Sequence, residues 1–189
     1  MFQSCIEVKK WLEGFQGHWM IAGGWAVDLH IGEVTREHEN INIAVFREDQ
    51  MMLYQWLEGW EFLAGEGEER IDWRGERHLK RPTHEIHAFS PGGIQLDFLL
   101  NEKVRGRWRF RSDDGLSYKL EHMHRQSEQG IPYLNPEIVL LYKSTHTRKK
   151  DLEDFLAVFP YLNNRQKEWL KQALMHHQPQ HPWLEALLY

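Results

Sequence analysis

The sequence predicts an α/β fold of the α+β kind, in which a small mixed sheet flanked by helices precedes a helical region. Three observations support this fold class. Apolar stretches with a period of two lie in the first two thirds of the chain, helical patterns lie between them, and strand patterns fade after about residue 118. We therefore expect two units, a sheet-containing domain over residues 1–115 and a helical domain over residues 116–189.

The composition is that of an ordinary globular protein and favours a small substrate over nucleic acid. The 189 residues are 41% hydrophobic, enough to bury a core, and the formal charge of −5 argues against general binding to nucleic acid. Cys5 is the only cysteine, so no intrachain disulfide is expected. We find no signal peptide and no apolar stretch long enough to span a membrane, and expect a cytoplasmic protein. The oligomeric state is not predicted.

The first half of the chain alternates between helical and extended patterns. The boundaries between them are marked by the Gly23-Gly24 pair and by a possible N-cap at Asp49. The apolar positions repeat every two residues in the expected strands and every three to four in the expected helices. The expected elements are a helix over residues 6–15, a strand over 18–22, a short helix after Gly24, a strand over 40–46 and a helix over 49–60.

A hairpin follows, and then the helical region. Residues 84–89 and 94–100 read as strands joined by Ser90-Pro-Gly-Gly93, since proline and glycine supply turn geometry. A further strand is expected near residues 60–64, and the basic cluster at 74–81 is expected to be exposed or mobile. The expected late helices are 138–146, 151–159, 165–176 and 182–188.

Tryptophan is unusually frequent, with nine residues. Several lie among leucines at helical spacing, which favours core packing over a functional role. The tryptophans assigned to the core are Trp11, Trp56, Trp60, Trp169 and Trp183.

The paired glycines Gly23 and Gly24 follow an apolar strand and open a helix. Such a turn brings backbone N–H groups and the positive end of the helix to one point, which suits a phosphate group. A Gly-Gly turn beside a strand is also common without any ligand. In the next strand, Asn40 and Asn42 share a face with Ala44 and project together.

Asp97 is the strongest single candidate for a functional residue. It lies within the apolar strand Ile94–Leu100, where a carboxylate is costly unless it is paired, hydrogen-bonded or metal-bound. The alternative is a structural ion pair with a nearby arginine. His84 and His87 alternate to opposite faces of the preceding strand and are therefore poor partners for one metal ion.

Two basic features invite a phosphate-binding interpretation. The segment from Arg105 to Arg111 alternates four arginines with Trp108 and Phe110; this suits either a triphosphate or a solvated face that protects an edge strand, and we favour the second. Lys143 lies in the apolar helix that opens at Asn135-Pro-Glu. A lysine there needs an anionic partner, which a nucleotide phosphate would supply.

These motifs together resemble a known family. Gly23-Gly-Trp-Ala-Val-Asp28, Gly32, and Thr35-Arg-Glu-His38 before an x-Ile-x-Ile strand are similar to the small-molecule nucleotidyltransferases, most closely the aminoglycoside and lincosamide adenylyltransferases of antibiotic resistance. The Leu96-Asp-Phe-Leu strand and the segments Gly130–Lys143 and Arg148–Phe155 extend the resemblance over nearly the whole chain.

The resemblance implies transfer of a nucleoside monophosphate from an NTP, with ATP expected, to a hydroxyl of a small molecule such as an aminoglycoside. It implies Mg²⁺ held at the positions of Asn40, Asn42 and Asp97, with Asp97 also acting as general base. It further implies nucleotide contacts from Gly23, Gly24, Arg36 and Lys143. The fold implied is the nucleotidyltransferase-like α+β domain with a helical C-terminal domain.

Asn40 and Asn42 depart from the family pattern, which has aspartate at both positions. Hard cations prefer charged oxygens, so the exchange weakens metal binding. Two interpretations follow: a catalytically inactive nucleotide-binding or regulatory protein on this fold, or an enzyme whose two aspartates were replaced. A scaffold without ligand is a third.

The acceptor side is expected to be acidic. Asp28, Glu37, Glu39 and Asp97 are assigned to it, and charge complementarity then favours a cationic, hydroxyl-bearing molecule. For Asp28, the helix pattern leaves open whether its carboxylate faces the cleft or solvent.

Overall fold

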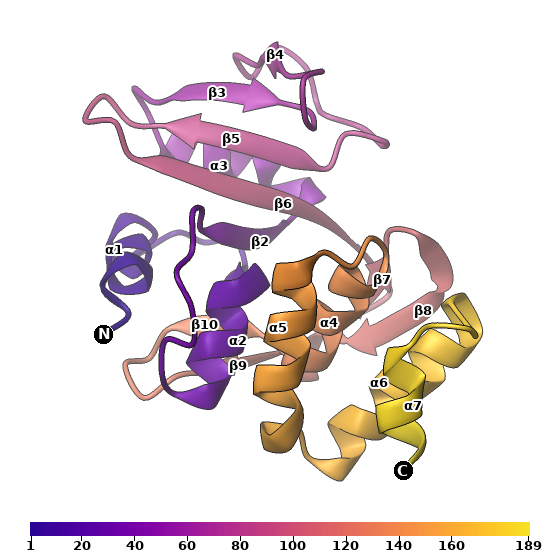
Figure 1. Cartoon of the computed structure of the whole chain (residues 1–189). Helices are drawn as coiled ribbons and strands as arrows, with labels where there is room; N and C mark the ends of the chain where they lie inside the picture. Colours follow the sequence, from indigo (N-terminus) through magenta and orange to yellow (C-terminus); the bar gives the residue numbers. More distant parts are fainter.

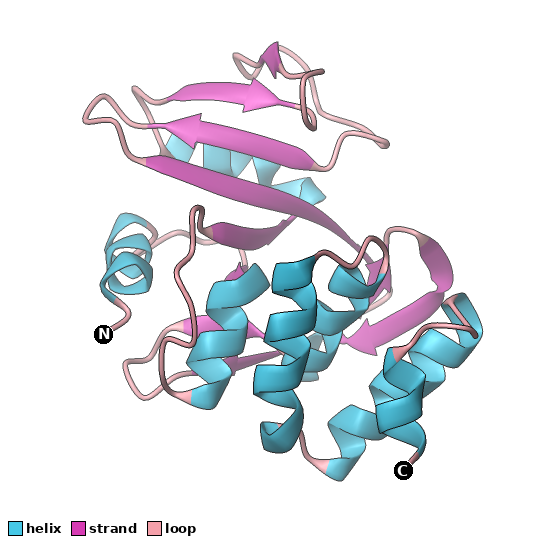
Figure 2. Cartoon of the chain, viewed as in Figure 1, coloured by secondary structure: helices cyan, strands magenta, loops and turns pink.

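A computed structural model describes all residues, 1–189, and shows a ten-stranded mixed sheet with helices packed against it (Figures 1 and 2). The strands are β1 (Trp19–Ala22), β2 (Asn42–Phe46), β3 (Glu61–Ala64), β4 (Ile71–Asp72), β5 (Glu85–Phe89), β6 (Gln95–Val104), β7 (Arg107–Phe110), β8 (Asp113–Lys119), β9 (His124–Gln126) and β10 (Pro132–Leu134). The predicted fold class is confirmed.

The helices lie where the periodicity predicts them, with ends that differ by a few residues. The α-helices are α1 (Gln3–Trp11), α2 (Gly23–Ile31), α3 (Gln50–Trp56), α4 (Pro136–Ser144), α5 (Lys149–Val158), α6 (Asn164–His177) and α7 (Trp183–Leu188). Short 3-10 helices are η1 (Arg47–Asp49), η2 (Leu120–His122) and η3 (Phe159–Tyr161). No helix combines the length and apolar character of a membrane span.

The sheet runs in the order β4-β3-β5-β6-β2-β1-β10-β9. The β2–β6 and β1–β10 pairs are parallel and the remaining pairs are antiparallel. The long strand β6 continues past this sheet to pair with β7, and β7 pairs in turn with β8. In Figure 1, α2 and α5 lie next to each other, and α4 lies between α5 and the β7–β8 hairpin.

The core sits between the sheet and these helices. Its 47 buried hydrophobic residues include Ile43 of β2 and Phe98 of β6, both fully inaccessible to solvent. Alternation sends those side chains into the core and turns Asn42 and Asp97 to the opposite face. Burial of this apolar surface is the main stabilising contribution to the fold.

The expectation that only helices follow residue 120 is wrong. The strands β9 and β10 are three residues each, too short for a period of two to be recognised, and β10 joins the sheet through a parallel pair with β1. The strand β8 runs across residues 115 and 116. The division into domains 1–115 and 116–189 stays a prediction.

Two of the tryptophans assigned to the core are half exposed. Trp11 and Trp56 are 39% and 40% exposed. Trp11 packs edge-on against Trp60, and Trp56 packs against Phe15 and donates a hydrogen bond from Nε1 to the Trp11 carbonyl at 2.8 Å. Trp183 is buried as predicted. The most enclosed tryptophans are Trp73 and Trp108, which lie in polar sequence contexts without helical spacing.

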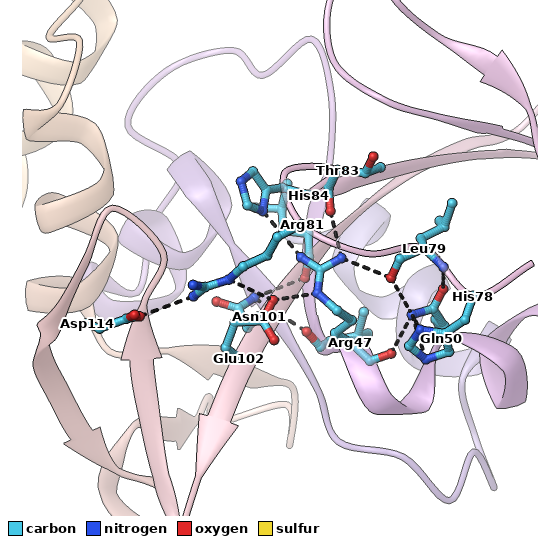
Figure 3. Close-up of polar contacts among 12 residues, drawn as sticks. Arg47, Gln50, His78, Leu79, Arg81, Thr83, His84, Asn101, Glu102 and Asp114 are labelled. Atoms are coloured by element: carbon cyan, nitrogen blue, oxygen red, sulfur yellow. Dashed lines mark hydrogen bonds and ion pairs between the residues drawn. The ribbon is translucent and has the colours of Figure 1, made fainter.

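The basic side chains of the cluster at 74–81 are exposed as predicted, and the loop that carries them contacts the sheet through the buried Leu79 and through Arg81 (Figure 3). The side-chain amide of Gln50 in α3 binds the backbone of the buried Leu79. Gln50 Oε1 accepts from the Leu79 N–H at 2.6 Å, and Gln50 Nε2 donates to the Leu79 carbonyl at 3.1 Å. Arg81 reaches Asp114 of the β7–β8 hairpin at 3.2 Å. These contacts tie the loop to both parts of the sheet.

Candidate functional site

A cleft of about 480 Å³ opens over β2 and β6 at the centre of the sheet. Its floor is made by side chains that alternate to this face of the two strands: Asn42, Ala44, Asp97, Leu99 and Asn101. The start of α2 forms one boundary of the cleft, and residues from α4, the α4–α5 loop and the start of α5 line another part.

The three predicted metal positions come together on this floor. Asn42 and Asp97 are direct partners in the parallel β2–β6 register, and Asn40 also lines the cleft. The alternation of β2 is therefore confirmed, since Ile41 and Ile43 are buried on the opposite face.

The glycine pair forms the entry to α2. Gly23 has φ +62°, and a Cβ at this position would lie 2.9 Å from Asn42 Nδ2. A Cβ on Gly24 would lie 2.5 Å from His38 Cε1. No side chain caps this end of α2, so its first N–H groups remain available to an anion in the cleft.

Asp97 is buried, at 6% exposure, and one of its oxygens is doubly engaged. Asp97 Oδ1 accepts from His87 Nδ1 at 2.7 Å and from Gln95 Nε2 at 2.9 Å. Burial acts to raise the pKa of Asp97, but these hydrogen bonds outweigh it and lower the pKa below its usual value. The alternative prediction, an ion pair between Asp97 and an arginine, is therefore wrong, because the partner of Asp97 is His87.

His87 is a cleft residue that the sequence analysis did not assign to the candidate site. Its hydrogen bond to Asp97, and then that to Glu85, raise the pKa of His87 to about 9, so the buried pair is an imidazolium and a carboxylate at neutral pH. The Ser90–Gly93 turn fixes the antiparallel register that places His87 opposite Asp97. Counting outward from that turn would have found the pair.

The donor set of the floor does not fit Mg²⁺. Asn40 and Asn42 offer neutral amide oxygens, and the one carboxylate, Asp97, already neutralises His87. No group of three or more His, Cys, Asp or Glu side chains is arranged to hold a metal ion. A hard cation gains its affinity from charged oxygens, which are too few here.

Asp28 lies beneath the cleft wall rather than on it. Its side chain is fully buried, and its carboxylate accepts from Thr35 Oγ1 and from His38 Nε2, each at 2.6 Å. Direct contact with a substrate, which we predicted, does not fit this enclosure. Asp28 instead fixes the loop that carries Arg36.

The two glutamates assigned to the acceptor are separated. Glu39 lines the cleft, whereas Glu37 is exposed and does not line it. The Glu37 carbonyl accepts from Arg36 Nη1 at 2.9 Å, so it is the backbone of this residue that is held in place.

Arg36 and Lys143 line the cleft but share buried acidic partners. Arg36 binds Asp154 through two hydrogen bonds, Nε–Oδ1 at 2.7 Å and Nη2–Oδ2 at 2.9 Å. Lys143 Nζ lies 2.8 Å from both Asp151 and Asp154. The anion that we expected for Lys143 is therefore supplied by α5, and this network ties the loop after α2 to α4 and α5.

The expectation of an acidic cleft is wrong. Four acidic side chains line it against six arginine and lysine side chains; the acids are Glu39, Glu85, Asp97 and Asp151, and the bases are Arg36, Arg70, Arg111, Lys143, Arg148 and Lys150. The net charge of a chain does not reveal how charges are distributed over its surface.

Arg111 belongs to the cleft, contrary to the interpretation of its segment as a solvated edge. The strand β7 is paired on both sides, so it has no free edge to protect. Trp108 and Phe110 are fully buried as the alternation predicts. His84 lies outside the cleft, near Arg47, so the two histidines of β5 and its entry do not share a site.

The family model described as Aminoglycoside-2''-adenylyltransferase matches residues 4–123, which include α1, the whole floor of the cleft and the His87–Asp97 pair. The chain belongs to the aminoglycoside-2''-adenylyltransferase family. Its nucleotidyltransferase relationship, inferred above from Gly23-Gly24 and the strands around Asn42 and Asp97, is thereby confirmed.

Solved structures share this fold of the family. The lincosamide antibiotic adenylyltransferase LnuA, bound to lincomycin, aligns with a TM-score of 0.59 and 17% identity over 85% of this chain and 98% of that chain. ANT(2'')-Ia in complex with adenylyl-2''-tobramycin aligns with a TM-score of 0.61 and 14% identity over 94% and 99%. No curated protein sequence matches the chain.

Proposed function

We propose that the cleft binds an NTP, ATP in the first instance, and transfers its nucleoside monophosphate to a hydroxyl of a small molecule such as an aminoglycoside. Membership of the aminoglycoside-2''-adenylyltransferase family supports this reaction type. The observation that carries the proposal is the meeting of the α2 N-terminus, Asn42 and Asp97 in one cleft. With ATP as the proposed substrate, we propose that the reaction takes place in the cytoplasm.

In this proposal each group has a separate role. The N–H groups after Gly23 and Gly24 bind phosphate oxygens. The acceptor hydroxyl attacks the α-phosphorus, Asp97 takes the proton of that hydroxyl, and pyrophosphate leaves. Arg36 and Lys143 hold α5 against the cleft through their ion pairs with Asp154 and Asp151.

The acceptor is proposed from chemistry and from relatives. Glu39 lines the cleft and offers a carboxylate to an ammonium group. Relatives of the same fold were solved with lincomycin and with an adenylylated tobramycin. We therefore keep a cationic, hydroxyl-bearing molecule as the acceptor class, with Glu39 as its proposed ionic contact.

Transfer by this chain should be slow, because the floor lacks the charged oxygens that Mg²⁺ requires. The same observation favours a second function, binding of nucleotide without transfer. Asn40 and Asn42 are neutral, and the Asp97 carboxylate is held by the His87 imidazolium rather than left free. Such a protein would act as a regulatory or sequestering pseudoenzyme.

Release of pyrophosphate from ATP in the presence of a panel of aminoglycosides and lincosamides separates the two functions. Slow release that depends on an acceptor and is lost in Asp97→Asn, together with an adenylylated product by mass spectrometry, supports transfer. Nucleotide binding without any product supports the second function. Absence of nucleotide binding at millimolar concentration rejects both and favours a scaffold role.

A further inference from the structure

Three basic side chains of the cleft, Arg70, Arg111 and Lys150, have no acidic partner, and Arg70 is exposed to solvent. Arg111 follows β7, and Lys150 lies in the first turn of α5. Both are half-buried, yet neither takes part in an ion pair or hydrogen bond. Arg36 and Lys143, by contrast, are neutralised by carboxylates at 2.7–2.8 Å. A half-buried cation without a partner favours an anion from outside the chain.

Arg111 is held in place rather than free to leave the cleft. Its guanidinium lies 5.4 Å from the centre of the Tyr142 ring. Tyr142 in turn donates a hydrogen bond to Asn101 Oδ1 at 2.9 Å, and the buried Trp108 donates to the same oxygen at 3.0 Å. The arginine is therefore anchored to the cleft floor through Tyr142 and Asn101.

The position of this anchor relative to Asp97 suits a polyphosphate. Asn101 lies four residues beyond Asp97 on β6, roughly 13 Å along the strand. Reaction at the α-phosphorus beside Asp97 leaves the terminal phosphates to extend along the floor. A guanidinium fork is well suited to phosphate oxygens, and an ammonium group adds a second point charge.

We propose that Arg111 and Lys150 form a clamp for the terminal phosphates of the bound nucleotide. The clamp rests on the proposed function for the identity of its ligand. It consists of cations of the protein itself, so it holds the phosphate chain without Mg²⁺. The clamp adds Arg111 and Lys150 to the residues that the sequence analysis had assigned to nucleotide binding.

The clamp is tested by calorimetric titration of the full chain with ATP, AMP and inorganic tripolyphosphate in EDTA. Arg111→Gln and Lys150→Gln should each weaken ATP and tripolyphosphate about tenfold, the effect of losing one charge-assisted contact, and leave AMP unchanged. Circular dichroism checks that each variant is folded.

Matched controls lie next to each clamp residue. Arg109→Gln removes the guanidinium of Arg109 in β7, two residues before Arg111; this guanidinium donates a hydrogen bond to the Asp114 carbonyl at 3.0 Å. Lys149→Gln removes the neighbouring lysine, whose side chain is 93% exposed. Neither residue lines the cleft, so both variants should bind ATP as the parent chain does.

Each other outcome is decisive. If ATP binds and the clamp variants match the parent chain, or if the controls lose as much affinity, the clamp is wrong and the proposed function stands. If the parent chain binds tripolyphosphate but no nucleotide, with the loss in both clamp variants, the clamp stands and the proposed function fails. Binding of neither ligand overturns both.

Discussion

At the scale of single residues, close approach explains why the cleft has glycine where α2 begins. Gly23 adopts φ +62°, in the left-handed region, and also packs against Asn42. Two costs therefore oppose any side chain at this position, one from the backbone and one from crowding. Gly59 carries only the first cost, because it has φ +84° and open space around it.

Gly23→Ala should lower the free energy of unfolding by about 1–3 kcal/mol more than Gly59→Ala does, since only the first also crowds a neighbour. It should also weaken ATP binding, because it displaces Asn42 and the first N–H groups of α2. Urea denaturation and ATP titration measure the two effects. Equal destabilisation by both variants would show that backbone conformation alone explains the glycine.

At the scale of elements, the Lys143–Asp151 pair and the neighbouring Arg148 join α4 to the first turn of α5. Burial acts to raise the pKa of Asp151, but hydrogen bonds from Arg148 and Lys143 outweigh it and lower the pKa to about 2. A carboxyl whose pKa is lowered on folding stabilises the protein above its unfolded pKa, and this contribution is lost as the pH falls.

Asp151→Asn should therefore destabilise the chain by about 2 kcal/mol at pH 6, and the difference from the parent chain should shrink between pH 4 and pH 2. Urea denaturation of both chains across this range provides the measurement. Glu153→Gln is the control, because Glu153 is half exposed and lies 3.8 Å from Lys149 at the surface. A pH-independent difference would contradict the assignment.

Elements were predictable where a period repeated often enough. Alternation over residues 40–46 and 94–100 placed Asn42 and Asp97 each opposite the apolar face of its own strand, and the parallel β2–β6 register makes them partners. The strands β9 and β10 could not be predicted, because three residues are too few to show a period of two. Contacts made by loops could not be predicted either. The enclosure of Asp28 by Thr35 and His38, for example, depends on how the loop after α2 folds back.

At the scale of the whole molecule, the cleft combines an uncapped helix N-terminus and basic side chains with a floor that lacks metal-binding charge. The α2 N-terminus, Asp97 and the basic side chains of the cleft are present together, while Asn40 and Asn42 are neutral. Two carboxylates that bind one metal act as a unit, so restoring either alone should achieve much less than restoring both.

The most direct test is Mg²⁺-dependent release of pyrophosphate from ATP, with an aminoglycoside acceptor, by the Asn40→Asp, Asn42→Asp double variant. We expect at least about a hundredfold increase over the parent chain, little gain from either single change, and loss of the gain when Asp97→Asn is added. A double variant that folds and binds ATP and Mg²⁺ but transfers nothing, or a parent chain that already turns over rapidly with Mg²⁺, would contradict the account.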